Sequence, residues 1–273
     1  LIGADEIWDD LDVTGKGITI AVIDTGIDYT HAMFGGSGDS DDYANNDPDT
    51  IEPGSFPTAK VIGGYDFAGS DYDASGEDGD PYPTPDDDPL DEYGHGTHVA
   101  GIAAGYDIGF GAGVAPDAKL YALKIFGREG STNLTLHAIE WAMDPKGLGH
   151  LAEPVDVINM SLGANWGPAD ENDPEYLAVE NATSIGVVVA ASAGNAGDQS
   201  YIVGSPSVSD SAISVASSTT GLQTLPYLTY FDNADEKIIP YTTSYNAFES
   251  TITADLVDVT DFDPTSELCT ISG

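Results

Sequence analysis

The sequence predicts an α/β fold, a doubly wound and mostly parallel sheet with helices on both faces. Short runs of β-branched and apolar residues, bounded by glycine or proline, indicate strands that are buried on both sides. Between them lie segments whose apolar residues recur every three or four positions, which is the spacing of an amphipathic helix. Strands and helices that alternate in this way are typical of parallel sheets.

The chain is expected to begin with a helical turn that directs Ile2, Ile7 and Trp8 inward. The first strand follows at residues 18–23 and runs directly into the residues D-T-G-I-D. Asp24 therefore stands at the carboxyl end of a buried parallel strand, where open α/β sheets place their ligand sites. The alternative interpretation of Asp24 is an ordinary turn residue that caps the next helix.

Residues 35–92 form a long insertion rich in Gly, Asp, Asn and Pro, with one strand expected at residues 60–67. Loops of this length are usually functional or disordered. Its acidic runs, around residues 39–49 and 86–91, provide the oxygen ligands that Ca²⁺ prefers. No EF-hand pattern is present. Two interpretations therefore stay open, a structural Ca²⁺ site with unknown ligands and a solvated acidic loop that binds no ion.

The stretch Y-G-H-G-T-H-V-A-G at residues 93–101 places two histidines three positions apart, at the start of a run of small apolar residues. This run predicts a tightly packed helix that begins near His95 and presents the imidazole to a cleft. A zinc site needs a further ligand beside a histidine pair, and Gly96 and Thr97 provide neither a ligand nor a base. We expect no metal at this pair, and polar capping of a helix is the simpler alternative.

The remaining elements continue the alternation of strand and helix. One helix is expected to begin after a capping Ser131 or Thr132 and to end at Asp144, with its apolar residues on one face. His137 on this helix is expected to be a surface or packing histidine and not a catalytic one. The other expected elements are strands at residues 118–126, 155–162, 186–193 and 212–218 and a helix at residues 174–185.

The charge of the chain excludes several classes of partner. Asp and Glu total 47 against 7 Lys and Arg, a formal net charge of −40 at pH 7. Nucleic acids and anionic membrane surfaces require basic patches, so neither is expected as a partner. No apolar run approaches the roughly 18 residues that a membrane helix needs. The excess of acid favours bound cations or a saline, extracellular setting.

Four strings occur in the order D-T-G-I-D, H-G-T-H-V-A-G, I-N-M-S-L-G and A-S-A-G-N. With them the chain resembles the subtilisin-like serine proteases (subtilases) over residues 1–218. The resemblance implies a subtilisin-like sheet. It also implies that Asp24 orients the imidazole of His95, that His95 is the general base and that Asn195 is the side-chain donor of the oxyanion hole. It further implies an edge on which an extended substrate docks. This edge consists of Ser161, Leu162 and Gly163.

The chain departs from the family at the nucleophile. Subtilases carry it in a G-T-S-M-A type of segment that opens a long helix, and no such segment is present. Ser244 and Ser266 follow a threonine but lack the glycine before it and the small apolar residues after it. We expect residues 1–219 to be a catalytic domain without its serine-bearing part, with a sheet incomplete at the C-terminus. Residues 220–273 are expected to be an extension that loosely resembles the approach to an inserted protease-associated domain.

These observations lead to a secreted serine endopeptidase of the subtilisin type that acts on polypeptides through Asp24, His95 and a serine outside this chain. The chain alone is expected to be inactive and to need the rest of its own polypeptide, but no catalytic cofactor. The alternative, from another class, is a non-catalytic, acidic, cation-binding module that binds extended peptides.

Overall fold

The structure is a computed structural model. It describes residues 2–109, 111–149, 151, 153–167 and 169–218, together with the backbone of residues 227–232 and 235–240. The contacts divide the chain into two compact units, Leu1–Ser217 and Ser218–Gly273. Ser244 and Ser266 lie outside the described residues, so the sequence-based expectations about them have no structural counterpart.

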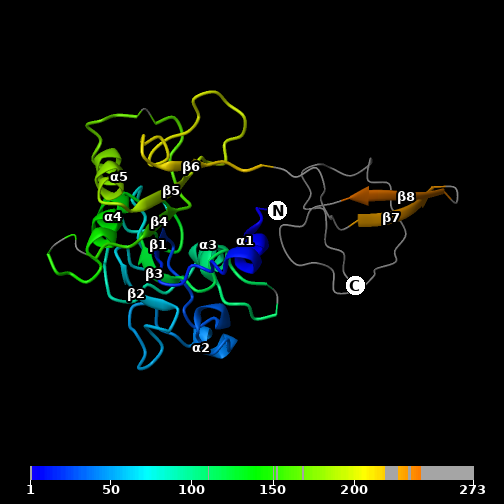
Figure 1. The fold of residues 1–273 in the computed structure, drawn as a ribbon, viewed down its shortest axis with the longest axis horizontal. Coiled ribbons are helices and arrows are strands. Elements are labelled where there is room, and N and C mark those ends of the chain that lie inside the picture. The colour runs from blue at the N-terminus through cyan, green and yellow to red at the C-terminus, as the bar shows by residue number, and fades with distance from the viewer. Residues whose placement is uncertain are drawn as a thin grey trace. The chain divides into compact units, whose positions relative to one another are not determined.

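A six-stranded sheet organises the first unit, with every neighbouring pair parallel (Figure 1). The order β2-β3-β1-β4-β5-β6 reverses direction on either side of β1, which creates a switch point beside that strand. The strands are β1 (Thr19–Asp24), β2 (Val61–Asp66), β3 (Lys119–Lys124), β4 (Val157–Met160), β5 (Val188–Ser192) and β6 (Ile213–Val215).

Helices cover both faces of this sheet. Ile20 and Val22 of β1 pack with α3 (His95–Ala104) on one face, whereas Ala21 and Ile23 pack with α4 (Thr135–Met143) and α5 (Pro174–Ser184) on the other. Figure 1 shows α4 and α5 side by side, across the strands from α3. Alternate residues of one strand thus belong to separate cores, which is why β1 reads as a continuous apolar run. The predicted doubly wound α/β class is confirmed.

The N-terminal helix α1 (Ala4–Leu11) differs from the prediction. Ile2 and Ile7 were expected to pack inward, but they are 73% and 44% exposed. Trp8 is anchored by its polar edge, because its indole Nε1–H donates to the carbonyl of Val114 at 2.9 Å. The prediction for Ile2 and Ile7 is therefore wrong.

The start of α4 also differs. The helix begins at Thr135 without a side-chain cap, although Ser131 or Thr132 was expected to cap it. Ser131 is engaged elsewhere, since its amide and hydroxyl both donate to the Asp73 carboxylate. Thr132 accepts only the amide of Leu134, at 3.1 Å. A contact across the fold has replaced the local cap.

The acidic insertion contains the short helix α2 (Ser40–Ala44) and the expected strand β2, and the short helix η1 (Ala32–Phe34) directly precedes it. In the second unit, β7 (Tyr227–Asp232) and β8 (Asp235–Pro240) form an antiparallel pair. In the described part of the chain, no helix combines the length and the apolar character needed to cross a membrane.

Candidate active site

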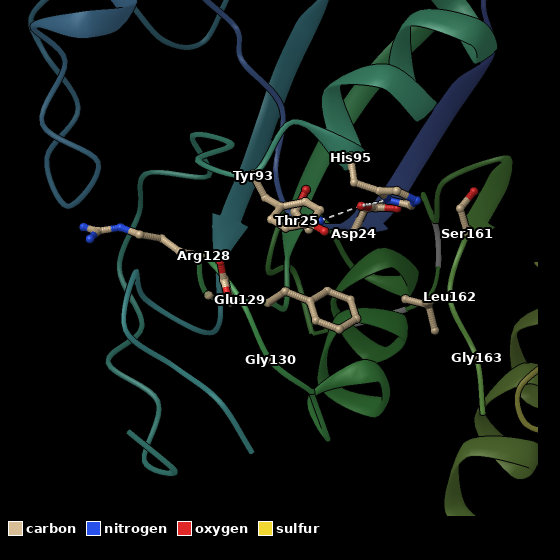
Figure 2. A pocket seen from close by; sticks show the side chains of 12 residues that line it. Asp24, Thr25, Tyr93, His95, Arg128, Glu129, Gly130, Ser161, Leu162 and Gly163 are labelled. Atoms are coloured by element: carbon tan, nitrogen blue, oxygen red, sulfur yellow. Dashed lines mark hydrogen bonds and ion pairs between the residues drawn. The ribbon is translucent and has the colours of Figure 1, made fainter. Parts of the chain in front are cut away.

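Asp24 and His95 meet at the switch point of the sheet. Asp24 is the last residue of β1 and is 1% exposed, and His95 is the first residue of α3. His95 Nδ1 lies 2.7 Å from Asp24 Oδ1, the contact dashed in Figure 2. The same oxygen accepts the amide of Thr25 at 2.8 Å. The structure thus brings together two residues that are 71 positions apart in the sequence.

Burial raises the pKa of Asp24 above its usual 3.8, and the hydrogen bond from His95 opposes that rise. An ionised carboxylate can only accept hydrogen bonds, so His95 donates through Nδ1. The Nε2 atom of the neutral ring then carries the lone pair, and none of the described residues hydrogen-bonds to it. The arrangement yields an oriented base whose free nitrogen is available to a reactant.

The close approach of α3 to β1 depends on a glycine. A Cβ atom placed on Gly96 would lie 2.2 Å from the carbonyl oxygen of Gly26, a distance that no side chain tolerates. Ala100 and Ala104 continue the small-residue face of the helix and are fully buried. This explains why H-G-T-H is followed by small residues rather than by leucines.

A cleft of about 430 Å³ opens in front of this pair. Ser161, Leu162 and Gly163, which follow β4, form one wall of the cleft, as Figure 2 shows. Their predicted role as a docking edge stays a prediction, but their place beside His95 is compatible with it. The opposite wall is the loop after β3, residues 126–130.

This second wall was not predicted from the sequence. G-R-E-G between a strand and a helix looks like an ordinary turn. Its position after β3, the neighbour of β1, could have marked it, because ligands bind at the carboxyl ends of strands beside a switch point. The acidic insertion supports the wall: the amide of Arg128 donates to the carbonyl of Ser70 at 2.9 Å, and its guanidinium pairs with Glu92 at 2.8 Å.

The family model for the subtilase family matches residues 15–270. The chain belongs to the subtilase family. Similar proteins include the minor extracellular protease Vpr of Bacillus subtilis, 36% identical over 246 residues, which are 88% of this chain and 25% of that protein.

Two further relatives differ in length and in the setting that their names give. The PII-type proteinase of Lacticaseibacillus paracasei is 33% identical, over 86% of this chain and 13% of that protein. The major intracellular serine protease of Bacillus subtilis is 34% identical, over 87% of this chain and 61% of that protein. The chain therefore spans a quarter or less of the length of the Vpr protease and of the PII-type proteinase.

Asn195 follows β5 in this subtilase. It is exposed, in a turn that follows β5, and is not among the residues that line the cleft. Its strand is nonetheless the direct neighbour of β4, which leads into the wall at Ser161. The predicted role of Asn195 as an oxyanion donor is untested by this geometry.

The acidic insertion presents no ready cation site. Among the described residues, no group of three or more His, Cys, Asp or Glu side chains could hold a metal ion. Several acids instead close turns of the loop: Asp39 accepts the amide of Asp41, and Asp42 accepts the hydroxyl of Ser37. No step of the chemistry is assigned to a metal.

Proposed function

We propose that this subtilase is part of a serine endopeptidase, in which Asp24 orients His95 and His95 acts as general base toward a serine outside residues 1–273. The contact of 2.7 Å between His95 Nδ1 and the buried carboxylate of Asp24 is the observation that carries the proposal. A serine hydroxyl is a weak nucleophile until an adjacent base removes its proton. His95 is the one histidine that lines the cleft within the described residues.

The proposed chemistry has two halves. His95 Nε2 accepts the hydroxyl proton as the serine attacks the peptide carbonyl, and then returns it to the leaving amine. Water repeats the sequence and releases the acyl group. Asp24 stays ionised and stabilises the imidazolium that forms in each half. Asn195 is proposed to donate to the oxyanion, on the strength of its A-S-A-G-N motif and its place after β5.

The substrate is proposed to be a polypeptide that lies extended between the two walls of the cleft. Residues 161–163 are an edge on which a peptide can add as a strand. Secretion is proposed on the acidic composition and on the likeness to a protease named as extracellular, although another relative is named as intracellular. No nucleic acid or membrane partner is proposed for a chain with 47 acidic and 7 basic residues.

A fluorophosphonate probe tests the proposal, because it reacts only with an activated serine. The probe is applied to the 273-residue chain and to the full-length product of its gene, and the labelled peptide is mapped. We expect label on the full-length protein alone, and none after His95→Ala. Label on a serine of the short chain would overturn the placement of the nucleophile. Peptide binding without any label would favour a non-catalytic peptide-binding module instead.

A structural Ca²⁺ is proposed only on the acidity of residues 35–92 and the habit of the family. Removing a bound ion with a chelator would lower the melting temperature, since a ligand that binds the folded state stabilises it. The measurement compares melts in EDTA and in CaCl₂ at equal ionic strength, with MgCl₂ as the control. Equal melting in all three would exclude the ion.

A further inference from the structure

The geometry points to Asp91 as a positioning residue that holds His95 against Asp24. This inference rests on the proposed function for its catalytic consequence, but not for its structural one. Asp91 lies four residues before His95, is 1% exposed and does not line the cleft. It therefore acts on the candidate base only through other groups.

The Asp91 carboxylate gathers the turn that leads into α3. Oδ1 accepts the amides of Tyr93 at 3.0 Å and Gly94 at 2.8 Å, and Oδ2 accepts the amide and hydroxyl of Thr97 at 2.9 and 2.5 Å. The first amides of a helix have no partner within the helix. Gly94 precedes α3 at φ 96° and has no side chain that could cap them. Asp91 supplies the missing acceptor from outside the helix.

A further bond ties the same carboxylate to β1. Thr25, directly after Asp24, donates its hydroxyl to Asp91 Oδ1 at 2.8 Å and accepts the amide of Gly96 at 2.8 Å. The residue after the carboxylate is thus bonded to the residue after the histidine, and Asp91 orients the hydroxyl that joins them. The buried side chain of Asp91 thus fixes the backbone segment that carries Asp24 to the backbone segment that carries His95.

The side chain of His95 itself is 46% exposed, so packing restrains the orientation of its ring only in part. Its distance to Asp24 is consequently set by where the backbone of α3 begins. A shift of about 1 Å in a positioned group can lower a rate about 100-fold. Asp91 therefore controls the hydrogen bond between Nδ1 and Oδ1 without touching either atom. Thr25 acts through its hydroxyl, in addition to the amide that it donates to Oδ1.

The test substitutes Asp91→Asn, whose side chain has one acceptor oxygen and would turn an NH₂ group toward donors. The matched control is Asp88→Asn. Asp88 is equally buried, three residues earlier, and binds the Tyr29 hydroxyl at 2.8 Å and the Leu90 amide rather than the start of α3. Thr25→Val is the second variant, because it keeps the shape and volume of the side chain but cuts the link to Gly96.

The primary readout is the Nδ1–H proton resonance of His95 in the ¹⁵N-histidine-labelled 273-residue chain, assigned by its loss in His95→Ala. We expect this resonance to be sharp in the wild type and in Asp88→Asn, and lost to exchange in Asp91→Asn and Thr25→Val. Circular dichroism identifies folded samples. If Asp91→Asn does not fold, Thr25→Val decides. A sharp, unshifted resonance in either folded variant would overturn the inference and leave Asp91 as a stabilising cap only.

The second readout is the peptidase activity of the full-length protein. We expect kcat to fall about 100-fold in Asp91→Asn with KM unchanged, and neither to change in Asp88→Asn. A fall that merely matches the loss of folded protein would contradict a positioning role. An inactive wild type would refute the proposed function, whereas the resonance would still report on Asp91.

Discussion

At the scale of single residues, the tautomer of one imidazole carries the proposed chemistry. Asp24→Asn keeps the shape of the side chain but presents an amide that can donate to Nδ1, which favours the tautomer with its proton on Nε2. We expect kcat of the full-length protein to fall about 10⁴-fold, the loss known for this change in another Asp-His-Ser triad. Peptide hydrolysis measures it, and melting curves are the control. A loss of less than tenfold would contradict the role of Asp24.

The buried carboxyl of Asp88 leads to a prediction about how the stability of the folded protein depends on pH. Burial raises its pKa to about 7, the charges of Asp86 and Glu52 act in the same direction, and hydrogen bonds from Tyr29 and Leu90 oppose them. Between the usual value of 3.8 and about 7, the folded state therefore holds a proton that the unfolded state has released. The proton on Asp88 therefore stabilises the folded state fully below pH 3.8, and this stabilisation is lost as the pH rises through 7.

Asp88→Asn removes that titration and keeps an acceptor oxygen for both hydrogen bonds. We expect the melting temperature of the wild type to fall more steeply than that of the variant between pH 5 and pH 8, with all other groups in common. Thermal melts in a series of buffers at constant ionic strength measure the two slopes. Parallel slopes would show that Asp88 titrates as an ordinary surface carboxylate.

At the scale of elements, the acidic insertion acts as a support for the cleft. Asp73 accepts the amide and hydroxyl of Ser131 at 2.7 and 2.9 Å and also holds the turn of its own loop through the amides of Glu77 and Asp78. A hydrogen bond from the Ser75 hydroxyl, followed by those from the amides of Ser131 and Asp78, holds the pKa of Asp73 far below its usual value. Ser131 directly follows the wall at residues 126–130.

Asp73→Asn weakens this anchor, so we expect the substrate wall to loosen and KM for peptides to rise about tenfold. Stability should also fall, and the difference from wild type should shrink below pH 4, where the wild-type carboxylate loses its advantage over the amide. Glu77→Gln, an exposed change on the same loop, is the control. The idea fails if both variants have the KM of the wild type.

The second wall of the cleft, residues 126–130, was not predicted from the sequence. The strands were predictable because β-branched runs bounded by glycine leave few alternatives, and Asp24 and His95 followed from their motifs at strand and helix ends. The missing cap of α4 and the anchor that directly follows the second wall both depend on the bond from Ser131 to Asp73, which joins residues 58 positions apart. A local pattern contains no signal for such a bond, and the hydroxyl of Ser131 reads equally well as a cap.

At the scale of the whole molecule, the large net negative charge affects the stability of the folded state. A chain with 47 acidic and 7 basic residues repels itself, which destabilises its compact state. Salt shortens the range of this repulsion from about 30 Å at 0.01 M to about 3 Å at 1 M. We therefore expect the melting temperature to rise with NaCl over this range. Melts with sucrose in place of salt control for solvent effects, and a flat or falling curve would contradict the expectation.

The contact between Gly96 and Gly26 also limits how this protein can diversify. A single β-carbon at position 96 would have to displace α3 from β1, so no gradual series of side chains leads away from glycine there. The exposed wall at Arg128 and Glu129 has no such restriction. In a library of random variants, selection for activity would leave position 96 invariant while the preference for peptide sequence drifts.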